Sequence, residues 1–509
     1  MSYTQNHTIC ESTTLYTISP SDYWVNINWF KVAKYVDKLQ RRIYRAVCEG
    51  DFRKVRNLQR ILYRSDSVLL LAIRRVTQTN KGRKTAGIDG FRALTDKKRA
   101  ELFYDMKGMN INLHVPKPAF RTYIRKKNGK LRPLSIPVIM DRIYQEIIRI
   151  VLEPQAEANF EPISYGFRPR RGVHDAVERI FNNIRNGKWC YVFESDFKSC
   201  FDTLDHDFIL RCIYGFPLYN VVEKFLKAGY VDNNVFYRTD KGTPQGGLLS
   251  PLLANIALTG MEEYLNITYK EMNRTRYGKE YSYFYTKGDY RVVRYADDFL
   301  VFAKTKENIL KVYDILEPYL EERGLTLAED KTKITHISKG FNFLGFNFRQ
   351  YKTKDGLKCF VKPSKKSIKE FKNKIAEIFR TSRGHSVDEL IDRLNPLIRG
   401  TANYWRTVVS YEIFKKMDHY IWTKTKKFLT RMHNNKGWKW IKNKYFPPYF
   451  DGKHYGNWVL TGPKKENHLI RMAWTPIKRH VMIKHNSSPY DVNLVEYFEN
   501  RKSDHLIIR

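Results

Sequence analysis

The sequence lacks several features that would place it in common classes of protein. None of its six cysteines stands in a C-x-x-C pair, so neither a zinc ribbon nor a disulfide framework is indicated. No apolar stretch approaches the length of a membrane span, and the polar N-terminus has no apolar segment typical of a secretory signal. No arginine precedes Arg41, unlike in an Arg-rich transit peptide. These absences predict a soluble protein that is not secreted, cytoplasmic in a bacterium or organellar if encoded in an organelle.

Acidic residues are also scarce. The 509 residues include 91 Lys and Arg against 53 Asp and Glu, a net charge of +38 spread along the whole chain. Such a surface attracts a polyanion, and nucleic acid is the default candidate. A ribosomal-type binding protein or a merely solvated basic face is the alternative, but this length predicts several domains with substantial cores. The 34 Tyr, 30 Phe and 9 Trp exclude a disordered basic polymer.

A short hydrophobic hairpin at 291–303, with the sequence RVVRYADDFLVFA, carries two adjacent carboxylates. Apolar and β-branched residues on both sides predict two strands, with Asp297 and Asp298 at the turn. Neighbouring carboxylates repel each other unless a cation lies between them. The hairpin therefore predicts a magnesium site.

Two-metal phosphoryl transfer needs a further carboxylate from elsewhere in the chain. Asp196 follows an apolar strand at 191–193, which would place it at a strand end facing a cleft. Asp202 and Asp205 lie in the following turn and helix start, where a helix-capping role is expected instead.

Other residues are compatible with a nucleotide site. The sequence has no P-loop, and Lys130 and Arg132 on an extended segment are candidates for binding a triphosphate. The glycines around Gln245 in the GTPQGG loop (242–247) would let a nucleotide or template approach the main chain, although such a cluster is first a turn. Phe201 could pack against a sugar or lie in the core.

The secondary-structure pattern divides the chain into three regions. Residues 24–79 have helical periodicity with interleaved Arg and Lys, and Val36, Leu39, Ile43 and Val47 form the expected buried face. From about 120 to 350, strand and helix signals alternate, including a helix at 141–160 and a glycine-rich loop leading into a helix at 242–258. After about 355 the chain is helical and basic again. The predicted fold class is α+β.

Ordered motifs along the chain resemble those of the group II intron-encoded reverse transcriptases and maturases. The motifs are TAGIDG (85–90), KLRPLSIP (130–137), SYGFRPRRGVHDA (164–176), SDFKSCFDTLDH (195–206), GTPQGGLLSPLLANI (242–256), YADD (295–298), GLTLAEDKTKITH (324–336) and FNFLGFNF (341–348). The similarity extends outward to residues 24–55, to LNPLIRGTANYWR (394–406) and to residues 475–491. It therefore covers nearly the whole chain from Trp24.

The resemblance implies a right-hand polymerase, with fingers and a palm built on an antiparallel sheet, followed by a helical thumb. It divides the chain into a flexible N-terminus (1–23), an N-terminal extension and start of the fingers (24–90), fingers and palm (91–350), a thumb or maturase (X) domain (355–445) and a basic DNA-binding-like segment (446–509). Relatives often continue into an HNH endonuclease with paired zinc-binding cysteines. No cysteine follows Cys359 here, so we expect that domain to be lacking.

The resemblance also implies roles for individual residues. Asp196 and Asp297 would ligate two Mg²⁺ ions, with Asp298 completing the triad. Gln245 would contact the incoming nucleotide and its template base, and Phe201 would exclude a 2′-hydroxyl. The remaining implied roles are leaving-group protonation by Lys331, with Lys333 as the alternative, and primer positioning by Phe343, Leu344 and Gly345.

The implied function is RNA-directed DNA synthesis that copies intron RNA during retrohoming, together with assistance of intron splicing. The expected partners are group II intron RNA as template and splicing substrate, a DNA primer or target and dNTPs, with no membrane; a homodimer is left open. The alternatives are a host-adapted reverse transcriptase in phage defence or CRISPR spacer acquisition, and a maturase that only binds RNA.

Overall fold

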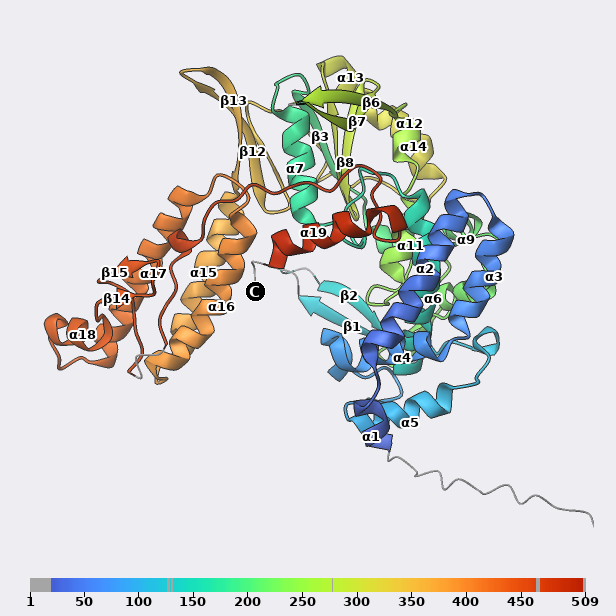
Figure 1. Ribbon diagram of the computed structural model, residues 1–509, viewed down its shortest axis with the longest axis horizontal. Helices are drawn as coiled ribbons and strands as arrows, with labels where there is room; N and C mark the ends of the chain where they lie inside the picture. The colour runs from blue at the N-terminus through green and yellow to red at the C-terminus, as the bar shows by residue number, and fades with distance from the viewer. Residues whose placement is uncertain (1–19, 126–128, 130, 277, 464–466, 507–509) are drawn as a thin grey trace, which may run out of the picture. The chain divides into compact units, whose positions relative to one another are not determined.

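The computed structural model describes residues 20–125, 129, 131–276, 278–463 and 467–506 (Figure 1). The chain forms two compact units, each assembled from separate stretches of sequence. The first contains Met1–Asn159, Ser199–Ala257 and Tyr490–Val492, and the second contains Phe160–Lys198, Leu258–Pro489 and Asn493–Arg509. Residues 1–19 and the candidate nucleotide-binding Lys130 lie outside the described residues.

The first unit begins with a set of capped helices. The side chain of Asn28 accepts a hydrogen bond from the backbone N–H of Lys31 at 2.9 Å, and Asp51 and Ser65 start the next two helices in the same way. The predicted buried face of this region is confirmed, since its four apolar residues are all buried. The helices are α1 (Pro20–Val25), α2 (Trp29–Cys48), α3 (Phe52–Tyr63), α4 (Asp66–Arg74) and α5 (Asp96–Met106).

The helix α6 (Ile139–Asn159) is the core of the first unit. It is buried along most of its length, and α2, α3 and α4 pack against it, as Figure 1 shows. Its bounds agree with the helix expected at 141–160. The later helices of the unit are α8 (Cys200–Thr203), α9 (His206–Cys212), α10 (Tyr219–Leu226) and α11 (Ser250–Ala257).

A four-stranded sheet in the first unit has the order β2-β1-β4-β5. β1 pairs antiparallel with β2, and Ala119 and Phe120 pair in parallel with the start of β4. The strands are β1 (Ala119–Arg125), β2 (Leu131–Ile136), β4 (Tyr230–Asp232) and β5 (Val235–Tyr237).

The second unit contains an antiparallel sheet of order β10-β3-β9-β8, the antiparallel sheet expected in a polymerase palm. β9 is its most buried strand, and helices pack on three of the four strands. α7 packs on β8, and α13 packs on β3 and β9. The elements are α7 (Val173–Ile184), β3 (Tyr191–Asp196), β8 (Tyr290–Tyr295), β9 (Asp298–Ala303), α13 (Lys306–Leu310), α14 (Val312–Glu321) and β10 (Lys333–His336).

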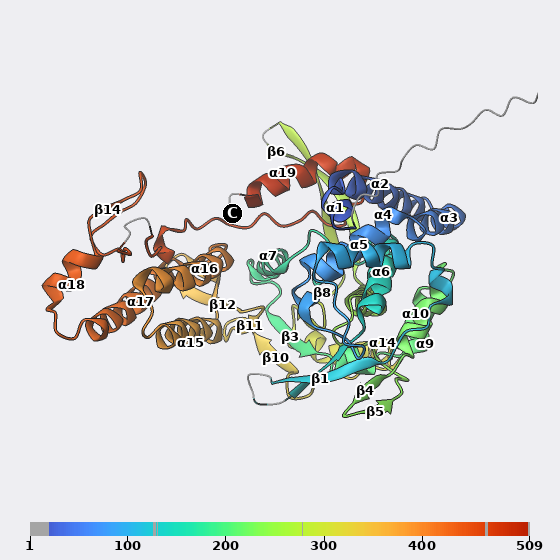
Figure 2. The same cartoon turned by 90° about the horizontal axis from the view of Figure 1, so that it is seen from below.

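Three helices near the C-terminus pack side by side in Figures 1 and 2: α15 (Lys365–Thr381), α16 (Val387–Trp405) and α17 (Tyr411–Met432). They are joined to the palm-like sheet by a three-stranded sheet of β11 (Phe341–Phe343), β12 (Phe346–Thr353) and β13 (Gly356–Pro363). One continuous hydrophobic cluster includes Val192 and Leu300 of the first sheet, Phe346 of the second and Leu394 of α16. The palm-like sheet and this helical region therefore share a core.

The rest of the second unit is formed by shorter elements and one long hairpin. These are α12 (Met261–Tyr264), the hairpin of β6 (Thr268–Arg276) and β7 (Lys279–Lys287), α18 (Trp438–Tyr445), β14 (Tyr449–Phe450), β15 (Tyr455–Gly456) and α19 (Val495–Leu506). Between Pro489 and Asn493 the chain returns briefly to the first unit. There the Tyr490 hydroxyl donates a hydrogen bond to Glu153 of α6 at 2.6 Å.

Candidate active site

The hairpin predicted at 291–303 is present as β8 and β9. The strands pair antiparallel with Tyr295 opposite Asp298, so Ala296 and Asp297 form the turn. β3 pairs with the other edge of β9 and places Asp196 directly opposite Asp298. The structure therefore brings the three predicted carboxylates to one end of the palm-like sheet.

The strands that carry the carboxylates are anchored in the core at this end of the sheet. Every residue of β9 after Asp298 is buried, and Phe299 stacks on Phe197, which directly follows Asp196 (ring centroids 5.0 Å apart). Phe197 also forms a β-bridge with Leu327. The carboxylates stand where the apolar strands end.

The YADD turn is supported from behind by the segment that contains Gly166. Ala296 has a φ of +57°, and a Cβ added to Gly166 would lie 2.4 Å from the Ala296 backbone nitrogen. Arg294 is fully buried, and its Nη1 donates to the Ala296 carbonyl at 3.3 Å. The backbone N–H of Tyr165 donates to the Arg294 carbonyl at 3.0 Å. The turn is therefore held by close backbone contact that only a glycine permits.

The electrostatics of the cluster favour a cation. Desolvation, followed by the negative charges of Asp297 and Asp196, raises the pKa of Asp298 to about 7. Oδ1 of Asp196 is buried and accepts no hydrogen bond from the described residues. A buried, unpartnered carboxylate oxygen beside two further carboxylates is costly unless a positive charge joins it.

That positive charge is supplied by Lys331, whose Nζ forms an ion pair with Oδ2 of Asp196. The hydrogen bond with Asp196 raises the pKa of Lys331. Lys333, the alternative named from the sequence, begins β10 opposite Glu194 instead. Of the two lysines, Lys331 is the one that contacts the carboxylate cluster.

The donor set suits a hard divalent cation, because Mg²⁺ binds through carboxylate oxygens and water. Among the described residues, no group of three His, Cys, Asp or Glu side chains is arranged as a finished metal cage. The lysine occupies one oxygen of Asp196, and the other is without a partner. The chemistry of these residues therefore fits the metal, and Oδ1 of Asp196 is the oxygen that the lysine leaves available.

Two other predicted site residues, Phe201 and Gln245, lie together in the first unit. Both line a cavity of about 410 Å³, to which residues of β1, β2 and the GTPQGG loop also contribute. Gln245 Nε2 donates to Asp202 at 2.9 Å, and the Gln245 carbonyl accepts from the backbone N–H of Ser135 at 2.7 Å. Phe201 is half-buried at this cavity rather than part of the core.

Strand alternation separates Arg132 from this cavity. Arg132 is exposed on β2, while its neighbours Pro133 and Ser135 line the cavity. The cation found in the lining from β1 is Arg121, whose guanidinium carbon lies 3.7 Å from the centroid of the Tyr230 ring. Arg121 was not predicted from the sequence. It is two residues from Tyr123, which also lines the cavity, and this spacing places both side chains on the same face of a strand.

One of the two helix-capping expectations for this region is wrong. Asp205 caps α9, accepting from the backbone N–H of Phe208 at 2.7 Å, but Asp202 does not cap a helix and binds Gln245 instead. The loop glycines lie against the chain's own backbone, as suits the turn that was the alternative, and the approach of a nucleotide or template to this loop stays a prediction. A Cβ on Gly242 would lie 2.6 Å from the Asp202 backbone, and one on Gly246 would lie 2.8 Å from the Ser135 carbonyl, so the chain's own backbone fills those spaces.

The predicted primer-positioning residues form the tight turn between β11 and β12. Leu344 and Gly345 both have positive φ values, of 47° and 82°. The Leu344 carbonyl accepts from the Tyr404 hydroxyl of α16 at 2.8 Å, and the Gly345 carbonyl accepts from Ser367 Oγ of α15 at 2.8 Å. Phe343 is buried in the core beneath the turn. The turn itself, and not Phe343, is the part that a ligand can reach.

Three protein families match consecutive parts of the chain. Residues 24–106 match the N-terminal domain of reverse transcriptase, and residues 124–348 match the reverse transcriptase (RNA-dependent DNA polymerase). Residues 368–446 match the group II intron, maturase-specific domain. The carboxylate cluster and the Leu344–Gly345 turn lie inside the second match, and α17 lies inside the third.

Three curated relatives are similar to most of the chain. Protein YkfC of Escherichia coli (strain K12) is 32% identical over 349 residues, covering 63% of this chain and 90% of the relative. The group II intron-encoded protein LtrA of Lactococcus lactis subsp. cremoris is 30% identical over 407 residues, covering 64% of this chain and 67% of the relative. Maturase-like protein 1 of Euglena gracilis is 25% identical over 417 residues, covering 79% and 83%.

The matched polymerase family and the carboxylate-tipped palm sheet define the class of this protein as an RNA-directed DNA polymerase with an α+β fold. The maturase match and the LtrA relative specify it further. The chain belongs to the group II intron-encoded reverse transcriptases and maturases. In the part of the chain that the structure describes, no helix has the length and apolar character needed to cross a bilayer.

Proposed function

We propose that this protein copies group II intron RNA into DNA at the Asp196–Asp297–Asp298 cluster and uses its basic surfaces to hold the same RNA for splicing. The observation that carries the proposal is the register of β3 and β9, which sets Asp196 opposite Asp298 beside the Asp297 turn. Expected substrates are an RNA template, a primer with a free 3′-hydroxyl and dNTPs.

In this mechanism the carboxylates provide a negative site for two Mg²⁺ ions. When bound, the ions supply activation of the primer 3′-hydroxyl and neutralisation of charge at the α-phosphate. Asp196 offers its unpartnered Oδ1, and Asp297 and Asp298 offer oxygens from the turn. Displaced from Asp196, the Lys331 ammonium is a charged donor for the leaving pyrophosphate.

Residues of the first unit and of the β11–β12 turn position the substrates. Gln245 is held by Asp202 and by Ser135, so its side chain is preorganised at the cavity where we place the nucleotide. Phe201 on the same cavity limits the space next to the sugar. Arg121 offers a guanidinium for the triphosphate, and the Leu344–Gly345 turn supports the primer end.

An Asp297→Asn substitution separates the two proposed roles. DNA synthesis on a primed RNA template should fall at least about a hundredfold, because the variant lacks one ligand charge at the metal site. Binding of the intron RNA and its splicing should stay within about twofold, since the amide has the same size and the turn backbone is unchanged. Primer extension and RNA filter binding measure the two outcomes.

Asp289→Asn is the matched control, because this exposed aspartate precedes the opposite end of β8. It should retain both activities. Loss of RNA binding in the Asp297 variant would contradict the separation of roles, and undiminished DNA synthesis would contradict the assignment of the metal site.

A further inference from the structure

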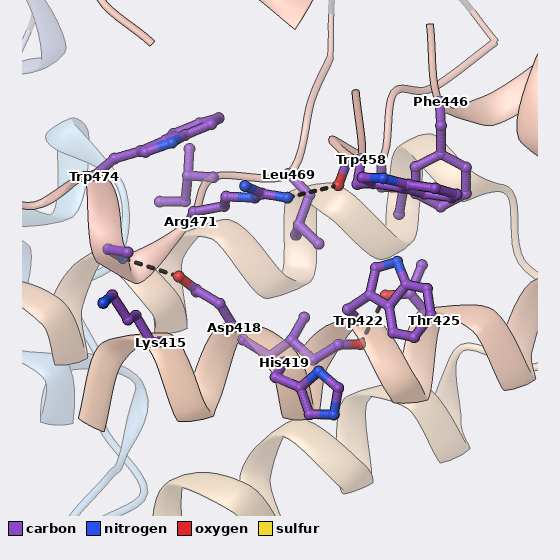
Figure 3. A pocket seen from close by; sticks show the side chains of 14 residues that line it. Lys415, Asp418, His419, Trp422, Thr425, Phe446, Trp458, Leu469, Arg471 and Trp474 are labelled. Carbon is purple, nitrogen blue, oxygen red and sulfur yellow. Dashed lines mark hydrogen bonds between the residues drawn. The ribbon is translucent and has the colours of Figure 1, made fainter. Parts of the chain in front are cut away.

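A cavity of about 620 Å³ lies far along the chain from the carboxylates, against the helix α17. Its floor is formed by α17, and its other walls come from the segment 446–474, which follows the maturase-specific match. Figure 3 shows Trp422 rising from α17 toward Trp458 and Phe446. The volume lies within the range of small-ligand pockets, about 300–1,000 Å³.

Aromatic side chains form walls of this cavity, and their contacts with one another leave part of each ring uncovered. Trp422 and Trp458 meet edge to face, with ring centroids 6.2 Å apart and planes at 89°, so the two indoles do not stack in parallel on each other. Phe446 tilts against Trp458 at 5.9 Å. Trp458 is 38% exposed. Partly exposed indoles around a cavity are suited to stacking on a planar ring.

The rim of the cavity is positively charged. Lys442 Nζ lies 4.8 Å from the Trp458 ring centroid, and Lys426 Nζ lies 5.7 Å from that of Trp422. Lys415 and Arg471 belong to the lining itself, and Arg471 Nη2 donates to the Trp458 carbonyl at 3.2 Å. Cations beside aromatic rings attract a ligand that has both a flat π-face and a negative backbone.

The one carboxylate in the cavity lining, that of Asp418, has a structural role. Both oxygens of Asp418 accept backbone hydrogen bonds, from Met472 at 2.8 Å and from Ala473 at 3.0 Å, as Figure 3 shows in part. Burial raises the pKa of Asp418, so its charged form is disfavoured. Asp418 therefore fastens the covering segment to α17 and leaves the aromatic walls and cations to face the ligand.

We propose that this cavity binds an unpaired nucleobase of single-stranded RNA, stacked on Trp458 and contacted at its edge by Trp422, with its phosphates near the lysines. The proposal rests on the RNA-binding role proposed above and adds a site to it. Charge complementarity favours this occupant over an apolar peptide, because the lysines lie at the aromatic rim.

The test substitutes two tryptophans, one at a time, in the full-length protein. It compares the affinities of the variants for a single-stranded oligouridylate of about twelve nucleotides. Trp458→Ala should weaken binding about tenfold, the range expected for loss of one stacked base. Trp440→Ala is the matched control. Trp440 is 39% exposed and has Lys444 Nζ at 4.8 Å from its ring, but it does not line the cavity. It should change binding less than about twofold, while Trp458→Phe should restore most of the affinity.

A second variant avoids removing a wall residue. Ala473→Leu adds volume at the lining and should also weaken binding several-fold, with an unchanged thermal unfolding midpoint as the check on folding. A blunt RNA duplex should bind equally to the parent and to both cavity variants, because its bases are not free to stack.

Equal losses in the Trp458 and Trp440 variants, or an equal loss on the duplex, would overturn the proposal. A loss on the matching DNA strand with none on RNA would overturn the assignment to RNA. Failure of the parent protein to bind RNA at all would contradict the proposed function and would be seen before any variant is compared.

Discussion

Single residues that pack against the YADD turn are as important to the site as the carboxylates that the turn carries. Gly166 approaches the Ala296 backbone so closely that no side chain fits, and Arg294 donates to the Ala296 carbonyl from the buried side. Because Ala296 has a left-handed backbone, the turn depends on these supports to keep its shape. The position of Asp297 is thus set by residues that never meet the substrate.

A Gly166→Ala substitution tests this support. The added methyl would lie 2.4 Å from the Ala296 nitrogen, so the turn must shift. Since a displacement of about 1 Å can cost about a hundredfold in rate, we expect a fall of that order in kcat for primer extension. The metal-independent binding of RNA should not change.

The matched control for that experiment is Gly172→Ala in the same segment. A Cβ on Gly172 meets no atom within 4 Å, and its φ of −153° suits any residue. Activity should stay within about twofold of the parent. A Gly166 variant with undiminished kcat would show that the turn is held by other contacts.

The sequence predicted the carboxylates at this scale but not their supports. Asp297 and Asp298 stand out because two acidic residues interrupt an apolar hairpin, and Asp196 because it ends an apolar strand. Arg121 and the Asp202–Gln245 hydrogen bond carry no such local pattern. They depend on which strand face and which loop meet after folding, and residue order alone does not show this.

At the scale of whole elements, the position of the β11–β12 turn is set by its contacts with helices. Its two carbonyls are held by hydroxyls from two different helices, Tyr404 on α16 and Ser367 on α15. The aromatic ring of Tyr404 also stacks on Phe346 at the start of β12, with centroids 5.1 Å apart. The turn is thereby coupled to the helical region that contains the maturase-specific match.

A Tyr404→Phe substitution removes the hydroxyl and keeps the stacking. Loss of one hydrogen bond of about 1 kcal/mol should raise the KM for the primer about fivefold, with little change in the KM for dNTPs. Steady-state primer extension with varied primer and varied dNTP separates the two constants.

Tyr420→Phe on α17 serves as the control, because its hydroxyl also donates to a backbone carbonyl, that of Lys372 on α15 at 3.3 Å. It should leave the KM for the primer unchanged. Equal effects of the two substitutions would mean that the helices, and not the turn, control primer use.

Local elements were predictable where periodicity is strong, as in the helix at 139–159 and the hairpin at 290–303. The sheet order β10-β3-β9-β8 was not read from the sequence. β10 and β3 are separated by more than a hundred residues, and their pairing is set by shared burial rather than by any neighbouring signal. The family resemblance provided the palm as an expectation, and the register of Asp196 opposite Asp298 came only from the fold.

The charge of the whole molecule makes a prediction independent of any one residue. With a net charge of +38, binding to RNA should release many counterions. We expect the affinity for intron RNA to fall about a thousandfold or more between about 50 and 200 mM monovalent salt. Filter binding at constant Mg²⁺ measures the slope. An uncharged-backbone oligonucleotide should show almost no salt dependence, and a flat response with RNA itself would contradict the charge argument.

The three residues Tyr490–Val492 have a consequence for how the protein is made. They belong to the first unit, whose helix α6 ends at Asn159. The contact of Tyr490 with Glu153 completes this unit, and it cannot form until more than three hundred further residues have left the ribosome. At about 5–20 residues per second that delay is on the order of 20–60 s. Throughout this time Glu153 lacks its hydroxyl donor. A nascent chain released before residue 490 would therefore have a first unit that lacks this contact. The cell's quality-control machinery would act on the incomplete unit.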